Sequence, residues 1–242
     1  MLSKKEIKDI QSLGLKKHRQ QTKLFIAEGP KVVGELAPLI PAHIQKVYAV
    51  DDWLKAYGGL LPSSVITEVS EAELERLSQL QTPNKVLAVL KQFEPEEPTS
   101  FSFALYLDTI QDPGNFGTII RIADWFGVKH VVCSPGCADL YNSKVVQSTM
   151  ASIARVNVYY DEANTWLAKQ KMPVYAATLD GTSIHELGKP EKGILLIGNE
   201  SKGLHPDLIR QATEKLTIPR IGAAESLNAA VATGIILSHL VG

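Results

Sequence analysis

Three loops in the second half of the chain carry polar side chains whose types and spacing could do chemistry. The first runs from Leu107 to Gly117 with Arg121 shortly after it, the second from Leu196 to Leu204, and the third from Ile218 to Ala230. Each loop follows a short apolar run that is typical of a buried strand. Because open α/β sheets bind ligands beyond the carboxyl ends of their strands, we expect the three loops to form one ligand site.

Several common ligand motifs do not fit these loops. The stretch from Gly198 to Gly203 resembles a phosphate loop, but Leu204 and His205 stand where that motif needs a lysine and a serine or threonine. Gly114 and Gly117 lack the third glycine of a dinucleotide fingerprint. The sequence therefore favours neither an ATPase nor an NAD enzyme.

The two cysteines, Cys133 and Cys137, are too few for a structural zinc site, since no second thiolate pair and no histidine cluster accompanies them. We expect no metal and interpret both as small buried residues at a turn. One close pair is also no disulfide framework for a chain of this length, so a reducing cytoplasm is the expected compartment.

Taken together, in this order and at these separations, the three loops resemble the signature motifs of the SpoU-type RNA ribose 2'-O-methyltransferases, members of the SPOUT superfamily. The resemblance covers most of residues 101–242, and residues 138–146 also fit it. The N-terminal segment is similar to the family's accessory substrate-binding domain of the L30e type, at residues 16–19, 25–29 and 85–89. One departure is Ala151, which lies in a stretch where the family commonly has a glycine.

The resemblance implies an α/β fold in which a C-terminal parallel-sheet domain carries a deep trefoil knot beside a small N-terminal α/β domain. It also implies a homodimer whose active site is completed across the subunit interface, with S-adenosylmethionine (S-adenosyl-L-methionine) as the cofactor. The positions that it assigns to the methyl donor are Thr178, Leu179, Gly198, Gly203, Ile218 and Leu227. Glycine at position 198 would permit close approach of the backbone to the donor.

The catalytic residues that the resemblance implies are Arg121, Asn115, Glu200, Ser226 and Asn228. A guanidinium is effectively always protonated, so we assign Arg121 to phosphate binding and charge stabilisation rather than to proton abstraction. Asn115 and Asn228 can orient Arg121 and the ribose, Glu200 can anchor Arg121 or its own loop, and Ser226 can cap a helix while touching the substrate.

The function that follows is 2'-O-methylation of a ribose in RNA, with ribosomal RNA as the leading substrate. A tRNA ribose methyltransferase is the alternative within the same chemistry. A noncatalytic RNA-binding protein that retains the fold is the alternative from another class, and the intact catalytic set argues against it. The balance of charges, with a formal net charge of −1, gives no global sign of a nucleic-acid binder.

The basic residues are concentrated at the N-terminus. Eight basic and three acidic residues between Met1 and Lys31 give this segment a local charge of +5. We predict that Lys16, Lys17 and Arg19 bind RNA, and a solvated helix face is an equally open reading of the same pattern.

The elements that must position these residues follow from the alternation of apolar runs. The 242 residues are 45% hydrophobic and 21% charged, which is typical of a folded globular protein, and no run is long enough to span a membrane. The proline- and glutamate-rich stretch 93–100 predicts a linker between a domain at 1–92 and a domain at 101–242. The runs expected to be strands are 23–27, 44–50, 65–69 and 86–90 in the first domain, and 103–107, 131–133, 156–159, 174–178, 194–197 and 216–218 in the second.

Two helices flank the predicted site. One is expected from Asn115 to Phe126, with Asn115 as its N-cap and Gly127 in a left-handed conformation after its end. The other is expected from Ser226 to Leu240, capped by Ser226. Because this last segment carries no formal charge when His239 is neutral, we expect it to be buried nearly all round, inside one domain or against a second subunit.

Overall fold

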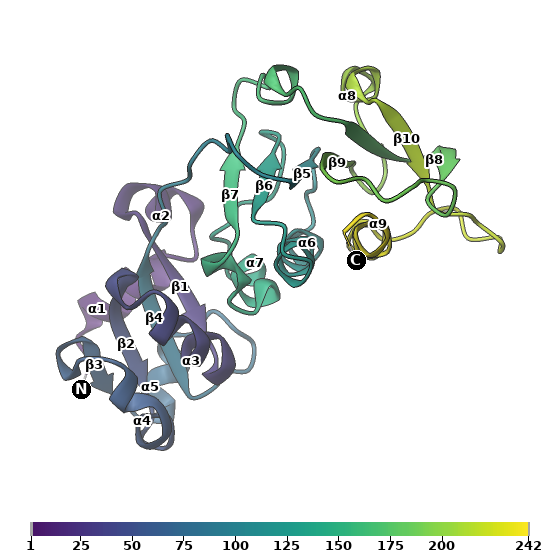
Figure 1. Cartoon of the computed structure of the whole chain (residues 1–242). Helices are drawn as coiled ribbons and strands as arrows, with labels where there is room; N and C mark the ends of the chain where they lie inside the picture. Colours follow the sequence, from purple (N-terminus) through teal and green to yellow (C-terminus); the bar gives the residue numbers. More distant parts are fainter. Residues whose placement is uncertain (1, 242) are drawn as a thin grey trace. The chain divides into compact units, whose positions relative to one another are not determined.

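A computed structural model describes residues 2–241 of the chain, and its contacts divide the chain into two units (Figure 1). The first unit comprises the chain up to residue 94 together with residues 139–154. The second comprises residues 95–138 and the chain from residue 155 onward. Both are α/β, as predicted.

The first unit is built on a mixed sheet of four strands in the order β1-β4-β2-β3. Strand β4 pairs antiparallel with both of its neighbours, whereas β2 and β3 are parallel. The strands are β1 (Leu24–Glu28), β2 (Ile44–Ala49), β3 (Ile66–Glu68) and β4 (Val86–Lys91). The helices are α1 (Lys4–Ser12), α2 (Lys16–Thr22), α3 (Pro30–Leu39), α4 (Asp51–Tyr57), α5 (Glu71–Leu77) and α7 (Ser143–Thr149), with 3-10 turns at Pro41–His43, Gly58–Leu60, Ser63–Val65 and Ser152–Ala154.

Residues 139–154 join the first unit through a buried ion pair. The Arg19 guanidinium lies 2.6 Å from Asp139 Oδ2, and Arg19 is only 4% exposed. Its Nη1 donates to the carbonyl oxygens of Leu13 and Gly14, at 2.7 and 2.9 Å. Arg19 therefore has no surface to offer a phosphate. This corrects its assignment as an RNA contact, because the same guanidinium geometry that suits phosphate also suits a buried carboxylate.

An aromatic cluster reinforces this attachment. The Tyr141 ring lies 4.9 Å from the Phe25 ring, centroid to centroid, and 6.5 Å from the Phe93 ring. The Phe93 N–H donates to the Tyr141 hydroxyl at 2.9 Å. Burial raises the pKa of Tyr141 to about 12, so this hydroxyl keeps its proton throughout the neutral range.

The second unit is built on a parallel sheet of six strands in the order β10-β8-β9-β5-β6-β7. The two central strands β9 and β5 are almost wholly buried, as expected for a parallel sheet covered on both faces. The strands are β5 (Phe103–Leu107), β6 (His130–Cys133), β7 (Asn157–Tyr160), β8 (Val174–Ser183), β9 (Gly193–Ile197) and β10 (Glu214–Thr217). The helices are α6 (Pro113–Trp125), α8 (Pro206–Gln211) and α9 (Ala229–Leu240), with a 3-10 turn at Leu167–Lys169.

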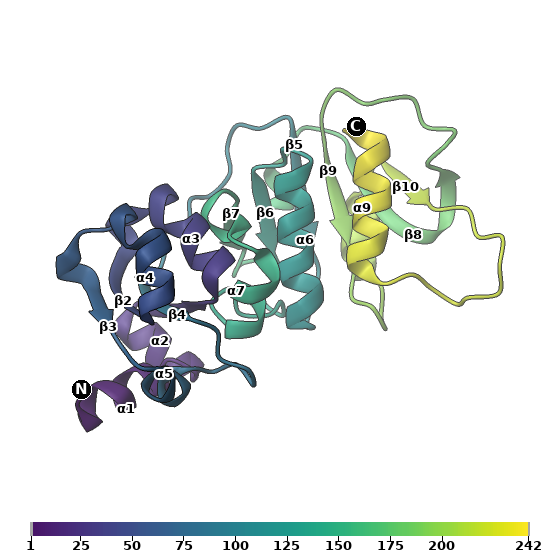
Figure 2. The same ribbon diagram turned by 90° about the horizontal axis from the view of Figure 1, so that it is seen from below.

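Helices α6 and α9 lie side by side on one face of this sheet (Figures 1 and 2). Residues of α8 and of the turn at Leu167–Lys169 pack into a cluster with strand residues such as Val132 and Ile194. The three loops with polar side chains leave the sheet at the carboxyl ends of β5, β9 and β10. Strands β5 and β9 are neighbours, and β8 lies between β9 and β10.

The N-caps of both helices differ from those predicted. Asp112 caps α6, since its side chain accepts from the Asn115 N–H at 2.8 Å. Asn228 caps α9, since its Oδ1 accepts from the N–H groups of Ala230 and Val231. Asn115 and Ser226 are therefore not caps. Pro113 explains the first difference, because proline is favoured at the first position inside a helix.

The last helix is not buried all round within this chain. On its outer side Val231 is 50% exposed and Ile235 is 36% exposed, whereas Thr233, Ile236 and Leu237 are buried.

Gly127, after α6, has a φ of +72° as predicted. The strand order does not by itself establish a knot, which stays a prediction.

Among the helices of residues 2–241, none has the length and apolar character needed to cross a membrane.

Candidate active site

Three amide and carboxylate side chains link the three loops of the second unit. Asn115 Nδ2 donates to Glu200 Oε1 at 2.8 Å, and Asn228 Nδ2 donates to Asn115 Oδ1 at 2.7 Å. Asn115 comes from the first loop, Glu200 from the second and Asn228 from the third. The chain of hydrogen bonds therefore brings together three of the five predicted catalytic residues, and Asn115 can take its central place because Asp112 caps the helix instead.

Arg121 stands apart from this chain. It is exposed on α6, six residues beyond Asn115, which corresponds to about 9 Å along a helix. Within residues 2–241 its guanidinium forms no hydrogen bond or ion pair, and Glu200 bonds to Asn115 rather than to Arg121. All of its donors therefore stay available for an anion from outside the chain.

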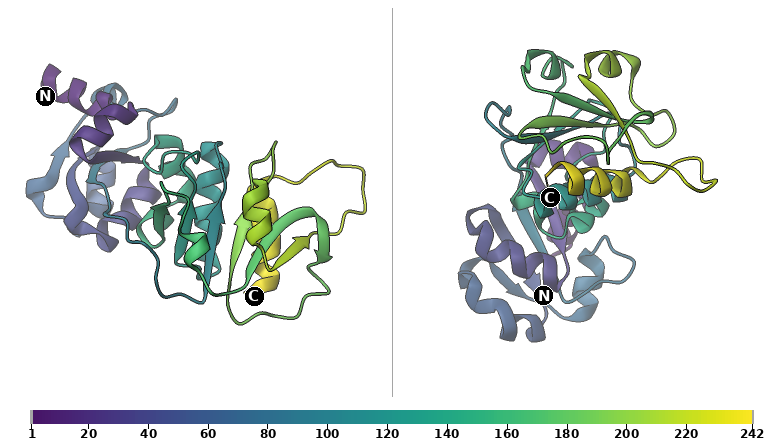
Figure 3. Two further views of the ribbon diagram at one scale, coloured as in Figure 1. Left: turned by 90° about the horizontal axis from the view of Figure 1, so that it is seen from above. Right: turned by 45° about the vertical axis from the view of Figure 1, so that its right-hand side comes forward.

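Ser226 lies in the exposed segment that connects β10 to α9 (Figure 3). Residues 219–228 are all exposed, and the hydrogen bond from Arg220 Nη1 to the Ala224 carbonyl spans part of this segment. No hydrogen bond within the described chain holds the Ser226 side chain, so Ser226 stays a prediction as a catalytic residue.

The loop after β9 forms a tight turn. Asn199 and Gly203 exchange two backbone hydrogen bonds, at 2.9 and 3.1 Å, and Gly203 has a φ of +68°. A Cβ on Gly198 would lie 2.3 Å from the Leu204 nitrogen and 2.4 Å from the Gly203 carbonyl carbon. Gly198 is thus required by the loop's own backbone, a reason that the sequence alone did not indicate.

Two polar residues that received no role from the sequence anchor this turn. The buried Asp108 accepts from the His205 N–H at 2.8 Å, and Asn199 Nδ2 donates to the Thr109 carbonyl at 2.8 Å. Their positions in the sequence could have identified them, because Asp108 directly follows the apolar run of β5 and Asn199 comes two residues after that of β9. Polar residues at such positions lie at the ligand-binding edge of a parallel sheet.

The predicted donor-binding residues come from β8, from the turn after β9 and from the segment after β10. Thr178 lies in β8, Gly198 and Gly203 follow β9, and Ile218 follows β10; β8 pairs with both other strands. Leu179 is 77% exposed and Leu227 is 46% exposed. Exposed apolar side chains and backbone groups at strand ends are the two kinds of group that suit an adenosine, which offers an apolar ring face and a polar edge. The residues present therefore fit the predicted cofactor.

Cys133 is the last residue of β6 and Cys137 lies in the turn after it, which differs in part from the interpretation of both as buried turn residues. Cys133 is buried and Cys137 is half-buried, and both are free thiols. Burial raises the pKa of Cys133, whereas a hydrogen bond with Cys133 lowers the pKa of Cys137. Cys137 Sγ also donates to the Leu107 carbonyl at 3.2 Å, so the turn supports the start of the first loop.

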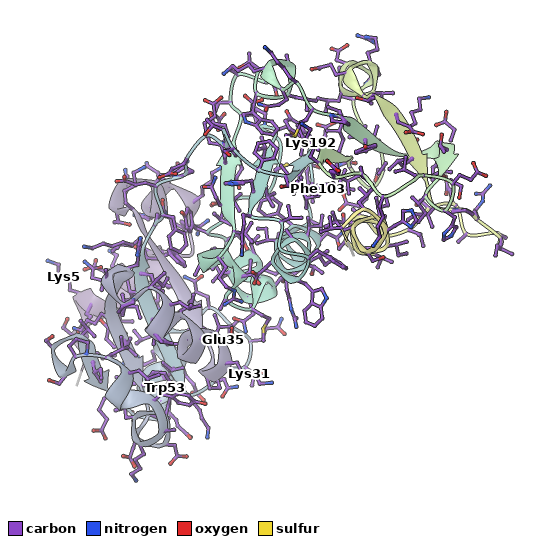
Figure 4. All side chains as sticks on the ribbon, in the orientation of Figure 1. Lys5, Lys31, Glu35, Trp53, Phe103 and Lys192 are labelled. Carbon is purple, nitrogen blue, oxygen red and sulfur yellow. The ribbon has the colours of Figure 1, made fainter. Side chains whose placement is uncertain are left out.

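The basic residues of the first unit differ in their exposure. Lys16 and Lys17 are exposed in the first turn of α2, and Lys5 is exposed on α1 (Figure 4). Cations at a helix N-terminus oppose the helix dipole, so Lys16 and Lys17 do not serve the stability of α2.

Comparison with known proteins gives two family matches and several full-length relatives. A model of the SpoU rRNA Methylase family matches residues 102–238, and one of the MRM3-like substrate binding domain matches residues 4–88. The 23S rRNA (guanosine(2553)-2'-O)-methyltransferase RlmP of Bacillus subtilis (strain 168) is 33% identical, over 98% of this chain and 96% of the relative.

Two solved structures resemble the whole chain. The AdoMet-bound rRNA methyltransferase from Sinorhizobium meliloti has a TM-score of 0.85 and 29% identity, over 99% of this chain and 95% of that one. A TrmH-family structure from Porphyromonas gingivalis has a TM-score of 0.88 and 38% identity, over 99% of this chain and 98% of that one.

The packing around Gly198 generates a prediction about the loop. Gly198→Ala should lower the free energy of unfolding by about 1–3 kcal/mol, because the added methyl group meets backbone that cannot move aside cheaply. Urea denaturation measures this change. The control is Gly188→Ala, whose Cβ meets nothing within 4 Å. Equal stability of the two variants would show that the loop relaxes around the methyl group.

Proposed function

The chain belongs to the SpoU rRNA methylase family, and we propose that it transfers the methyl group of S-adenosylmethionine to a ribose 2'-hydroxyl of ribosomal RNA. The observation that carries the proposal is the hydrogen-bonded chain from Glu200 through Asn115 to Asn228, which joins the three loops. Arg121, further along α6, is unpaired within residues 2–241. Ribosomal RNA is preferred over tRNA because the rRNA enzyme RlmP is similar over nearly the full length of both chains.

We assign the donor to the turn after β9 and to its neighbours. Gly198, Ile218 and Leu227 would hold it through their backbone groups, with Thr178, Leu179 and Gly203 lining the same site. When bound, the donor supplies an electrophilic methyl group on a sulfonium. The protein's task is then to hold the ribose oxygen in line with that group and to exclude water, since orientation dominates such displacements.

We propose that Arg121 binds the phosphate next to the target ribose and stabilises the negative charge that develops on its oxygen. Arg121 does not remove the proton, because a guanidinium stays protonated at neutral pH. Asn115 donates to Glu200 and accepts from Asn228, and the Asn228 oxygen also accepts from the start of α9, so both ends of each amide are engaged and the orientation of both side chains is fixed. The network therefore serves as a preorganised frame for the ribose.

Transfer of tritium from labelled S-adenosylmethionine to purified ribosomal RNA tests the function. We expect the wild-type protein to label ribosomal RNA, with the label recovered as 2'-O-methylated nucleoside. Labelling of tRNA alone would show that the protein is a tRNA ribose methyltransferase instead. Failure to bind S-adenosylhomocysteine at millimolar concentration, with the protein folded, would contradict the methyl-donor assignment.

The same assay tests Arg121. Arg121→Lys keeps the charge but loses the planar fork, so the single-turnover rate with saturating RNA should fall about 10²-fold or more. Arg121→Ala should be at least as slow, and both should bind S-adenosylhomocysteine like the wild type. Near-normal rates would make Arg121 a surface residue; loss of cofactor binding would place it in the donor site.

For RNA binding we propose the basic side of residues 1–92, with 93–100 as the linker to the methyltransferase domain at 101–242. Lys16 and Lys17 are the leading phosphate contacts, since both are exposed and unpaired within the described chain. Asp51, Asp52, Glu68, Glu71 and Glu73 line a cleft elsewhere in the same unit, and such a surface repels phosphate.

Reversing the charges of Lys16 and Lys17 to glutamate should weaken RNA binding and flatten its dependence on salt. The slope of log K against log salt should fall by about 0.7–0.9 for each lost phosphate contact. The control reverses Lys55 and Lys85, which pair with Asp51 and Asp52, and so makes the same change in net charge. An unaltered slope in the variant with Lys16 and Lys17 reversed would show that these two residues form a solvated helix face and do not contact RNA.

We propose that the protein is a homodimer that covers the outer face of α6 and α9. Trp125 on α6 is 85% exposed, and Val231 and Ile235 form an exposed apolar stripe on the adjacent α9. Arg121 lies one helical turn before Trp125. A second copy on this face would bury the apolar groups and place Arg121 at the subunit interface, as the sequence resemblance implies.

Ile235→Glu should convert the dimer into monomers, because it would bury an unpaired carboxylate in the interface. Sedimentation velocity at micromolar concentration measures the change. Leu60→Glu, at an exposed leucine of the first unit, is the matched control and should leave the dimer intact. A monomeric wild-type protein would refute the proposed interface.

A further inference from the structure

We propose that Asp108 and Asn199 are positioning residues that hold the turn after β9 in the conformation needed by the methyl donor. The proposal rests on the function proposed above and assigns roles to two side chains outside the predicted site. Neither residue needs to touch the donor, since both act through the backbone of the turn and of the first loop.

Asp108 links the end of β5 to the far end of the turn. Its backbone N–H donates to the Ile197 carbonyl at 2.8 Å, in register with the end of β9. Its carboxylate is buried, and Oδ2 accepts from the His205 N–H at 2.8 Å while Oδ1 accepts from Ser134 Oγ at 3.3 Å. A buried carboxylate is costly unless it is hydrogen-bonded. One oxygen here bonds to His205, the N-cap of α8 just beyond the turn, and the other bonds to Ser134 directly after β6.

Asn199 links the near end of the turn to the first loop and uses both ends of its amide. Its Oδ1 accepts from the N–H groups of Ser201 and Lys202, at 2.9 and 3.1 Å, and so shapes the turn itself. Its Nδ2 donates to the Thr109 carbonyl at 2.8 Å and so ties the turn to the neighbouring loop. The amide oxygen of Asn199 therefore shapes the turn, whereas its amide nitrogen attaches the turn to the first loop, and a substitution can remove one function without the other.

Thr109 shows that this tie carries strain. It has a φ of +53°, which is unfavourable for a β-branched residue. Ser134 Oγ accepts from its N–H at 2.9 Å, and Asn199 bonds to its carbonyl. Such conformations persist where the surroundings fix them on several sides, and they cluster at functional sites.

The consequence concerns the donor-binding turn and the catalytic network that contacts it. The turn contains Gly198 and Gly203, assigned to the donor, and Glu200, which bonds to Asn115 of the catalytic network. Residues 200–203 are exposed, so the side chains at the two ends of the turn determine where its middle lies. If the tie is broken, fewer molecules hold the turn in the binding-competent form, and the apparent donor affinity falls by that fraction.

Asn199→Asp tests this with an almost isosteric change. It keeps the oxygen that accepts from Ser201 and Lys202, but it places a second oxygen against the Thr109 carbonyl. We expect S-adenosylhomocysteine to bind about tenfold or more weakly by calorimetry, the scale of one lost hydrogen bond that leaves its partner unpaired. RNA affinity should stay close to the wild-type value, and the urea midpoint should fall only by the cost of that one bond.

Asn142→Asp is the matched control. Asn142 caps α7 through its Oδ1, which accepts from the Lys144 N–H at 2.9 Å, and aspartate retains that bond. Asp108→Asn is the second test variant and should also weaken S-adenosylhomocysteine binding, since its amide cannot accept at both former oxygen positions. Should Asn199→Asp fail to fold, Asp108→Asn decides the question.

The outcomes separate this inference from the function on which it rests. A wild-type protein that binds S-adenosylhomocysteine, with test variants that bind it equally well, overturns the positioning role and leaves the function standing. Parallel losses of donor affinity, RNA affinity and stability would show a general structural role and also overturn it. A folded wild-type protein that binds no S-adenosylhomocysteine refutes the proposed function, and this inference with it.

Discussion

The second unit depends on the hydrogen-bonding limits of a parallel sheet that is covered on both faces. Strands β5 and β9 are buried along their length, so polar side chains can be accommodated only where these strands end. Asp108, Asn199 and the capping residues all lie at that edge. The arrangement therefore places fixed polar groups at this edge. Some of them bond to the loops, and the others remain free for a ligand.

The assignment of helix caps illustrates how this edge is shared. Asp112 accepts a hydrogen bond from a backbone N–H at the start of α6, and Asn228 does the same at the start of α9. The Asn228 amide nitrogen also donates to Asn115. One side chain thus caps a helix and connects two loops. The cap bonds are local and fix the Asn228 side chain against the first turn of α9. The hydrogen bond from Asn228 to Asn115 is therefore held in a fixed position as well.

The sequence predicted the α/β fold, all ten described strands to within a few residues at their ends, and the three loops, because apolar periodicity and loop motifs are local signals. It misplaced both caps, since Asn115, Asp112, Ser226 and Asn228 are all competent capping residues and only the folded geometry selects among them. Arg19 and Arg121 show the same limit. Arg19 is buried against Asp139 and Arg121 stays exposed, although nothing in the residue type distinguishes them.

The attachment of residues 139–154 to the first unit has a consequence for the biosynthesis of the protein. This segment lies in the chain between β6 and β7 of the other sheet, yet it supplies Asp139 and Tyr141 to the first unit. As the polypeptide leaves the ribosome, the N-terminal unit cannot close around Arg19 until Asp139 has emerged, 45 residues after Glu94. Its completion therefore falls after the first two strands of the parallel sheet have been translated, so the two units mature as interleaved steps rather than one after the other.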